Sequence, residues 1–174
     1  MGPPGVGKGT QAEQIKTYFG IAHLSTGDIL RSEIKAQSRI GIESKIYMNT
    51  GRLVPDAVLL SIVKECITKP NCAKGYLLDG FPRTIPQAEG LDKINQGFDL
   101  VILDLSMPVM DGFEFLANLE TLQLDNPPAI IVNSAMQLDE VMLSKLTNQC
   151  SGIVDKTKID ARKDLKELIE ATIS

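Results

Sequence analysis

The sequence predicts an α/β protein with a single doubly wound, mostly parallel sheet of about five strands and helices on both faces. Short apolar or β-branched runs recur along the chain, helical patterns separate them, and the connections are short turn clusters at 95–97 and 125–128. Alternating strands and helices favour parallel pairing, with ligands bound beyond the carboxyl ends of the strands. A chain of 174 residues is long enough for one domain with a hydrophobic core, so we expect one α/β domain over 1–174, a hybrid of the two parts described below.

Each element follows from its local pattern. The runs that qualify as strands are 21–26, 76–79, 100–105, 129–134 and 153–155. Helical patterns cover about 10–19, 28–36, 56–68, 86–94, 111–123, 138–148 and 163–172. The last is the clearest, because Leu165, Leu168 and Ile169 share a face opposite Lys166 and Glu167.

Residues 2–10 read GPPGVGKGT, which is typical of a phosphate-binding loop. Glycines let backbone N–H groups turn toward phosphate oxygens, a lysine adds charge, and the helix that follows presents its positive end to the anion. The candidate phosphate-binding residues are Gly5, Gly7, Lys8, Gly9 and Thr10.

Two features make this loop unusual. The general pattern places Ser or Thr directly after the lysine, whereas here Gly9 precedes Thr10, and only Met1 stands where the loop needs a strand to anchor it. The alternative is a disordered Gly/Pro-rich start. Residues 11–16 favour the loop, because they read as a helix directly after it.

Composition limits the partners. The chain has a net charge of −4 and few aromatic residues, and no Lys or Arg occurs between Lys93 and Lys145, so nucleic acid is not expected as a ligand. Without an apolar run of about 18 residues or a basic-then-apolar leader, we expect no membrane contact and a soluble, cytoplasmic protein. The odd number of cysteines and the single histidine, His23, favour neither a disulfide framework nor a zinc site.

From residue 2 to about 94 the chain resembles adenylate kinase. The motifs that carry the resemblance are, in order, GPPGVGKGTQ at 2–11, HLSTGDILR at 23–31, GRLVPD at 51–56 and GYLLDGFPRT at 75–84. The Gly9-Thr10 order is that family's own variant. The resemblance implies a nucleoside monophosphate kinase that uses Mg²⁺, ATP and AMP.

The same resemblance implies roles for single residues. It implies catalytic roles for Lys8 and Arg83 at the phosphates and for Asp79 at Mg²⁺. It implies that Thr26 and Arg31 bind AMP. It further implies that Leu53 and Val54 line the adenine of AMP and that Gln87 pairs with this base. Arginine forks suit phosphate oxygens, and a carboxylate at a strand end suits hydrated Mg²⁺. Taken singly, each residue has the alternative of being an ordinary surface or turn residue.

From about residue 98 to 174 the chain resembles a bacterial response-regulator receiver domain. The similar segments are LVILDLSMPVMDG at 100–112, IIVNSA at 130–135 and GIVDK at 152–156. The resemblance implies that Asp104 accepts a phosphoryl group, that Ser134 senses it and that Lys156 pairs with it. The prediction is therefore a fusion of two related folds, natural or engineered, with parts 1–97 and 98–174.

Both resemblances are incomplete. The kinase's first strand and its arginine-bearing lid are missing, as are the receiver's first two strands with their acidic metal ligands. Phosphoryl transfer depends on positioned cations, so we expect weak or no turnover. A missing central strand also leaves a sheet edge that a second copy of the chain can pair with, so a homodimer is predicted.

One hypothesis for a metal site follows from the same gap. If the strands ending at Asp79 and Asp104 pair directly, their carboxylates lie about 5 Å apart and could hold Mg²⁺. The alternative is that both are solvated acids at the ends of loops. Three functions thus remain open: the kinase, a receiver-like phosphoacceptor at Asp104, and a recombined chimera without activity.

Overall fold

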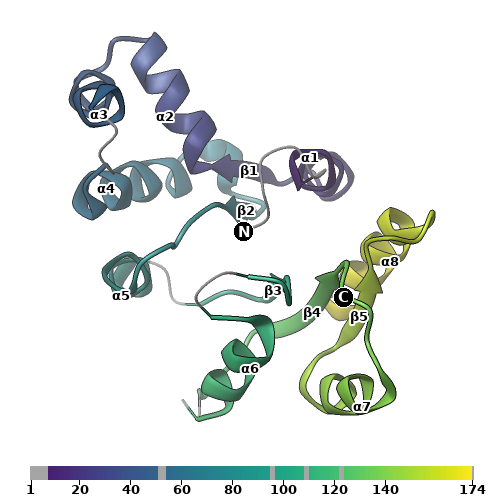
Figure 1. The fold of residues 1–174 in the computed structure, drawn as a ribbon. Helices are drawn as coiled ribbons and strands as arrows, with labels where there is room; N and C mark the ends of the chain where they lie inside the picture. Colours follow the sequence, from purple (N-terminus) through teal and green to yellow (C-terminus); the bar gives the residue numbers. More distant parts are fainter. Residues whose placement is uncertain (1–7, 51–53, 95–96, 108–109, 122–123, 174) are drawn as a thin grey trace. The chain divides into compact units, whose positions relative to one another are not determined.

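The computed structural model describes residues 8–50, 54–94, 97–107, 110–121 and 124–173. Its helices are α1 (Lys8–Phe19), α2 (Thr26–Lys35), α3 (Arg39–Asn49), α4 (Asp56–Ile67), the short 3₁₀ turn η1 (Pro70–Cys72), α5 (Ile85–Ile94), α6 (Gly112–Thr121), α7 (Glu140–Gln149) and α8 (Ala161–Ile173). Its strands are β1 (Ala22–Ser25), β2 (Tyr76–Asp79), β3 (Leu100–Leu103), β4 (Ala129–Ser134) and β5 (Gly152–Asp155) (Figure 1).

The α/β class and the parallel pairing are confirmed, but the single continuous sheet is not what the described residues form. They make one sheet with the order β1-β2 and another with the order β3-β4-β5, and every described pair is parallel. The chain accordingly divides into two compact units, with the boundary between residues 96 and 97. Sequence patterns identify strands well, yet they do not say which strands pair.

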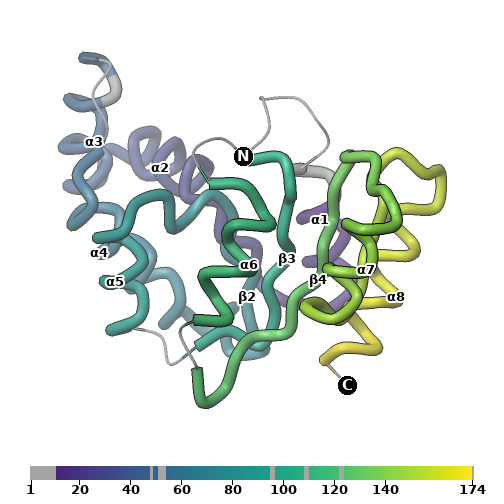
Figure 2. Tube along the Cα trace, turned by 60° about the horizontal axis from the view of Figure 1, so that its bottom comes forward, coloured from purple at the N-terminus to yellow at the C-terminus, as the bar shows by residue number. Residues whose placement is uncertain are grey.

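In the unit that ends at residue 96, β1 and β2 lie in register, with Ser25 opposite Asp79. Their carboxyl ends therefore meet, which brings the first residue of α2 beside the turn that follows β2. One core cluster joins β1 to the helices through Leu24, Leu30 and Ile62. A second cluster joins α4 to α5 through Val63, Phe81 and Leu91. Figure 2 traces α2 to α5 in this unit.

Helix α3 was not predicted. Gly41 lets it approach α2 so closely that an added Cβ would lie 2.1 Å from the Glu33 carbonyl oxygen. Ser38 Oγ accepts a hydrogen bond from Gly41 N at 2.9 Å, which satisfies a backbone donor in the first turn. The helix thus depends on a tertiary contact, and its sequence has only a weak amphipathic pattern.

In the unit that starts at residue 97, β4 is the central strand and is buried from Ile130 to Ser134. Ile130 and Val132 share a core cluster with Leu116 of α6 and Leu146 of α7. Ile131 points to the opposite face because neighbouring residues of a strand alternate, and α8 contacts β4 and β5. Helices therefore cover both faces of this sheet, as the doubly wound prediction requires (Figure 1).

Among the helices of the described ranges, none combines the length and apolar character needed to cross a membrane. The predicted homodimer stays a prediction. Within the described residues, β2 has a ladder partner in β1 alone.

Candidate functional site

The predicted phosphate loop is described only from its helical end. Helix α1 begins at Lys8, so Lys8, Gly9 and Thr10 form its first turn, while Gly5 and Gly7 lie outside the described residues. The first backbone N–H groups of a helix have no intrahelical acceptor and favour an anion. The arrangement of these three residues is compatible with the predicted phosphate contact.

Thr26 and Arg83 meet at one backbone carbonyl. Thr26 Oγ1 donates to Gly80 O at 3.2 Å, and Arg83 Nε donates to the same oxygen at 2.7 Å. Gly80 has a φ of 74°, and an added Cβ would lie 2.8 Å from Arg83 Nη2. The left-handed φ therefore favours a glycine at this turn, and the missing side chain leaves room for the guanidinium that lies beside it.

Arg83 keeps donor capacity for a ligand. Its side chain is exposed, and in the described part of the chain no carboxylate lies within ion-pair distance of it. A guanidinium has five N–H donors and Nε uses one of them, so the terminal nitrogens can bind phosphate oxygens in a fork. Arg31 differs, because its guanidinium forms an ion pair with Asp28 and lowers the pKa of that carboxyl.

Asp79 ends β2 and contacts the only histidine. His23 Nε2 lies 3.3 Å from Asp79 Oδ2, and His23 Nδ1 lies 4.0 Å from Glu13 Oε2 of α1. The histidine side chain is 12% exposed, whereas that of Asp79 is 39% exposed. One carboxylate oxygen thus faces the imidazole, and the group remains open to solvent and to a ligand.

Gln87 is buried at 4% exposure, and hydrogen bonds hold both ends of its amide. Its Oε1 accepts from the Arg83 backbone N–H at 2.7 Å, and its Nε2 donates to Asp56 Oδ1 at 2.6 Å. Val54 packs at the edge of the neighbouring core cluster, and Leu53 lies outside the described residues.

A second cluster lies at the carboxyl ends of β3, β4 and β5. Lys156 Nζ donates to Asp104 Oδ2 at 2.7 Å, and Ser134 Oγ donates to Asp104 Oδ1 at 3.2 Å. The backbone N–H of Ser106 also donates to Oδ1, at 3.2 Å. The structure therefore brings together all three residues that the receiver resemblance selected.

The charge of Asp104 is stabilised in place. Burial alone would raise its pKa, but the hydrogen bond and positive charge of Lys156, helped by Ser106 and Ser134, hold the pKa of Asp104 below its ordinary value. The side chains of Lys156 and Asp104 are 20% and 18% exposed. This is an ionised pair that is partly shielded from water.

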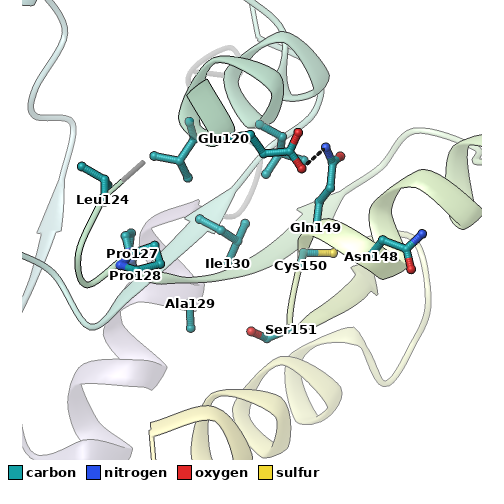
Figure 3. A pocket seen from close by; sticks show the side chains of 12 residues that line it. Glu120, Leu124, Pro127, Pro128, Ala129, Ile130, Asn148, Gln149, Cys150 and Ser151 are labelled. Carbon is teal, nitrogen blue, oxygen red and sulfur yellow. Dashed lines mark hydrogen bonds between the residues drawn. The ribbon is translucent and has the colours of Figure 1, made fainter. Parts of the chain in front are cut away.

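A hollow of about 450 Å³ lies at the other end of the same sheet, where β4 and β5 begin (Figure 3). Ala129, Cys150 and Ser151 line it, and Gln149 Nε2 donates to Glu120 Oε1 across its rim at 2.9 Å. Burial raises the pKa of the Cys150 thiol, which keeps it protonated and weakly nucleophilic. The hollow is thus separate from the Asp104 cluster and contains no activated group.

The direct pairing of the strands that end at Asp79 and Asp104 stays a prediction. Asp79 ends a strand that pairs with β1, and Asp104 follows a strand that pairs with β4. The pairing therefore gives no support to a shared Mg²⁺ site, and within the described ranges no three acidic, cysteine or histidine side chains gather as metal ligands. Asp79 alone still fits Mg²⁺, because that ion is usually held by one or two carboxylates, phosphate oxygens and water.

Comparison with known proteins assigns the family. The family model described as adenylate kinase matches residues 1–171 of the chain. The chain belongs to the adenylate kinase family. The matched range includes the segment that resembles a receiver domain. The receiver resemblance of this adenylate kinase family member therefore stays a proposal.

Curated relatives support the same family. An adenylate kinase of Carboxydothermus hydrogenoformans is 61% identical over 93 residues, which are 53% of this chain and 44% of that protein. An adenylate kinase of Methanothrix thermoacetophila is 52% identical over 112 residues, covering 62% and 52% of the two chains. One of Clostridium botulinum is 54% identical over 116 residues, covering 67% and 53%. The chain spans about half the length of the curated relatives it matches.

Two residues of this family member escaped the sequence-based selection of site residues. Asp56 lies inside the quoted motif at 51–56 but received no role, and its contact with Gln87 spans 31 positions. His23 opens another quoted motif and was noted only as the single histidine. Its contact with Asp79 follows from the parallel register of β1 and β2, which places His23 opposite Leu77, two residues before Asp79.

Proposed function

We propose that this chain binds AMP and Mg·ATP and transfers the γ-phosphoryl group of ATP to a phosphate oxygen of AMP. One P–O bond forms on AMP, the bond between the β- and γ-phosphates breaks, and two ADP molecules result. The observation that supports this best is the meeting of Thr26 and Arg83 at the Gly80 carbonyl. Two residues that the family resemblance selected for phosphate and AMP thereby meet at one carbonyl oxygen.

Each residue has a defined task in this proposal. Arg83 binds phosphate oxygens with its terminal nitrogens, Lys8 and the first turn of α1 bind the other phosphates, and Gln87 binds the adenine. Bound Mg²⁺ would be held by Asp79 and would neutralise charge on the transferred phosphates. The protein contributes positioning and cations, which is the main form of catalysis in phosphoryl transfer.

We further propose that turnover is weak. The segment between Lys93 and Lys145 contains no Lys or Arg, so it offers no cation to the charge that develops during transfer. A single arginine can contribute about 10³–10⁵-fold in phosphoryl transfer. Nucleotide binding uses residues before this segment, so we expect the chain to bind nucleotides although it turns them over slowly.

A calorimetric titration with a dinucleotide of two adenosines joined through phosphates tests this proposal, because it needs both nucleotide sites but no turnover. Tight binding that is weakened at least about tenfold in Arg83→Ala and in Lys8→Ala would support it. Lys93→Ala is the matched control, because it removes an exposed cation at the end of α5. A folded chain that does not bind the dinucleotide would refute it.

A second candidate function rests on the Asp104 cluster. We propose that Asp104 Oδ attacks the phosphorus of a small phosphodonor such as acetyl phosphate, releasing acetate and leaving an aspartyl phosphate. Lys156, at 2.7 Å in the present structure, would then pair with the phosphoryl oxygens, and Ser134 would donate to one of them. This change of partners would form a charge switch.

Mass spectrometry after treatment with acetyl phosphate and Mg²⁺ tests the second candidate. We expect the mass of the unaltered chain to rise by one phosphoryl group. This gain should be absent in Asp104→Asn and present in Asp99→Asn, which removes an exposed acid just before β3. Equal modification of both variants, or none of the unaltered chain, would exclude Asp104 as the acceptor.

A further inference from the structure

The amide of Gln87 is held in one orientation by two partners with fixed hydrogen-bonding roles. The Arg83 backbone N–H, 2.7 Å from Oε1, can only donate. The Asp56 carboxylate, 2.6 Å from Nε2, accepts when ionised. Exchange of the amide oxygen and nitrogen would place two donors together at one end and two acceptors together at the other.

Asp56 is itself positioned by the neighbouring helix start. Its Oδ2 accepts from Thr84 Oγ1 at 3.0 Å, and Thr84 Oγ1 accepts from Gln87 N at 3.3 Å. Asp56 is the first residue of α4, and Thr84 directly precedes α5, two helices that pack together. Gln87 is 4% exposed, so little water can compensate a reversed amide.

We propose that Asp56 is a specificity-determining positioning residue, which fixes the Gln87 amide so that it accepts a 6-aminopurine and rejects a 6-oxopurine. The inference rests on the proposed function, in which Gln87 contacts the base of the monophosphate. Asp56 does not touch the base and acts through Gln87.

The selectivity follows from the hydrogen bonds that remain. With one amide hydrogen bound to Asp56 and one Oε1 lone pair bound to Arg83 N–H, the head group retains one donor and one acceptor for a ligand. Adenine presents an N6–H donor beside the N1 acceptor. Hypoxanthine presents an O6 acceptor beside an N1–H donor, so in the same pose it meets like groups at both positions.

A chain that can reverse the amide would lose this discrimination. In Asp56→Asn, the new amide can donate to a reversed Gln87, which removes one of the two conflicts that oppose reversal. The conflict with the Arg83 N–H remains, so selectivity should fall without vanishing. IMP binding should strengthen relative to AMP binding.

The test is calorimetric measurement of the dissociation constants for AMP and IMP with the whole chain. The unaltered chain is expected to prefer AMP by at least about tenfold, since an unpaired or opposed polar group in a binding site is costly. Asp56→Asn should reduce the ratio of the two constants at least about threefold. Asp92→Asn, which removes an exposed acid of the same α5 helix, should leave the ratio unchanged.

A second variant keeps the test decisive if Asp56→Asn does not fold. Thr84→Val removes the hydroxyl that orients the Asp56 carboxylate and is expected to lower the same ratio by a smaller factor. A variant that folds and keeps the full AMP preference would overturn the inference, as would an unaltered chain that binds AMP and IMP equally. An unaltered chain that binds neither nucleotide would refute the proposed function itself.

Discussion

Replacing Asp104 by Asn should destabilise the unit that starts at residue 97 by about 2 kcal/mol. The carboxylate lies 2.7 Å from Lys156 Nζ, and the two side chains are 18% and 20% exposed. A solvated surface pair contributes about 0–1 kcal/mol, whereas breaking a fully buried pair costs about 3–5 kcal/mol. The intermediate burial and the loss of a charge-assisted hydrogen bond place the expected cost between these limits.

The assay is equilibrium urea unfolding of the whole chain, followed by backbone amide resonances of β3 and β4, because the two units need not unfold together. Asp104→Asn, Lys156→Met and the double variant form a cycle with an expected coupling of about 1–2 kcal/mol. Asp125→Asn, an exposed acid in the turn before β4, serves as the control. A coupling below about 0.5 kcal/mol would refute the reasoning.

The same pair gives a pH dependence with a defined sign. The pKa of Asp104 is lowered in the folded state, so its stabilisation is present above the ordinary aspartate pKa and is lost as pH falls through the lowered value. The stability difference between the unaltered chain and Asp104→Asn should therefore be constant near neutral pH and should shrink below about pH 4. A difference that grows on acidification would contradict the assignment.

Two further predictions concern the unit that ends at residue 96. Gly41→Ala should lower the free energy of unfolding in urea by about 3 kcal/mol or more, because the new Cβ would collide with the Glu33 backbone 2.1 Å away. Gly20→Ala, with a φ of 64° and open space around it, should lower it by only about 1 kcal/mol. Equal losses in the two variants would show that α2 and α3 do not pack this closely. The thiols of Cys66 and Cys72 are buried, and burial raises the pKa of each. Both thiols should therefore react with iodoacetamide at pH 8 far more slowly in the folded chain than after unfolding in urea. Equal rates in the two states would contradict their burial.

The strands could be predicted from the sequence because each is a run of apolar residues that are neighbours in the chain. The prediction for 76–79 agrees with β2 and the prediction for 129–134 with β4. Pairing between strands is not local, and the described residues form two parallel sheets where one was expected. Helix α3 was missed for a related reason, since Gly41 favours a helix only when α2 is close beside it.

The candidate site shows the same division. The adenylate kinase resemblance predicts that Gln87 contacts the base, but the motifs did not show that the Arg83 N–H and Asp56 bind its amide. Those partners depend on how α4 packs against α5. The receiver resemblance selected Asp104, Ser134 and Lys156 as a set. Each of them ends or follows a strand, and adjacent parallel strands bring such positions together.

The carbonyl oxygen of Gly80 receives both Thr26 and Arg83, and a main-chain atom cannot be removed by a point substitution. Sequence drift can alter the two donors separately while the acceptor persists wherever the turn is kept. Loss of one donor therefore leaves the acceptor and the other donor in place. The left-handed glycine turn is the part on which both side chains depend, because it presents the oxygen that they share.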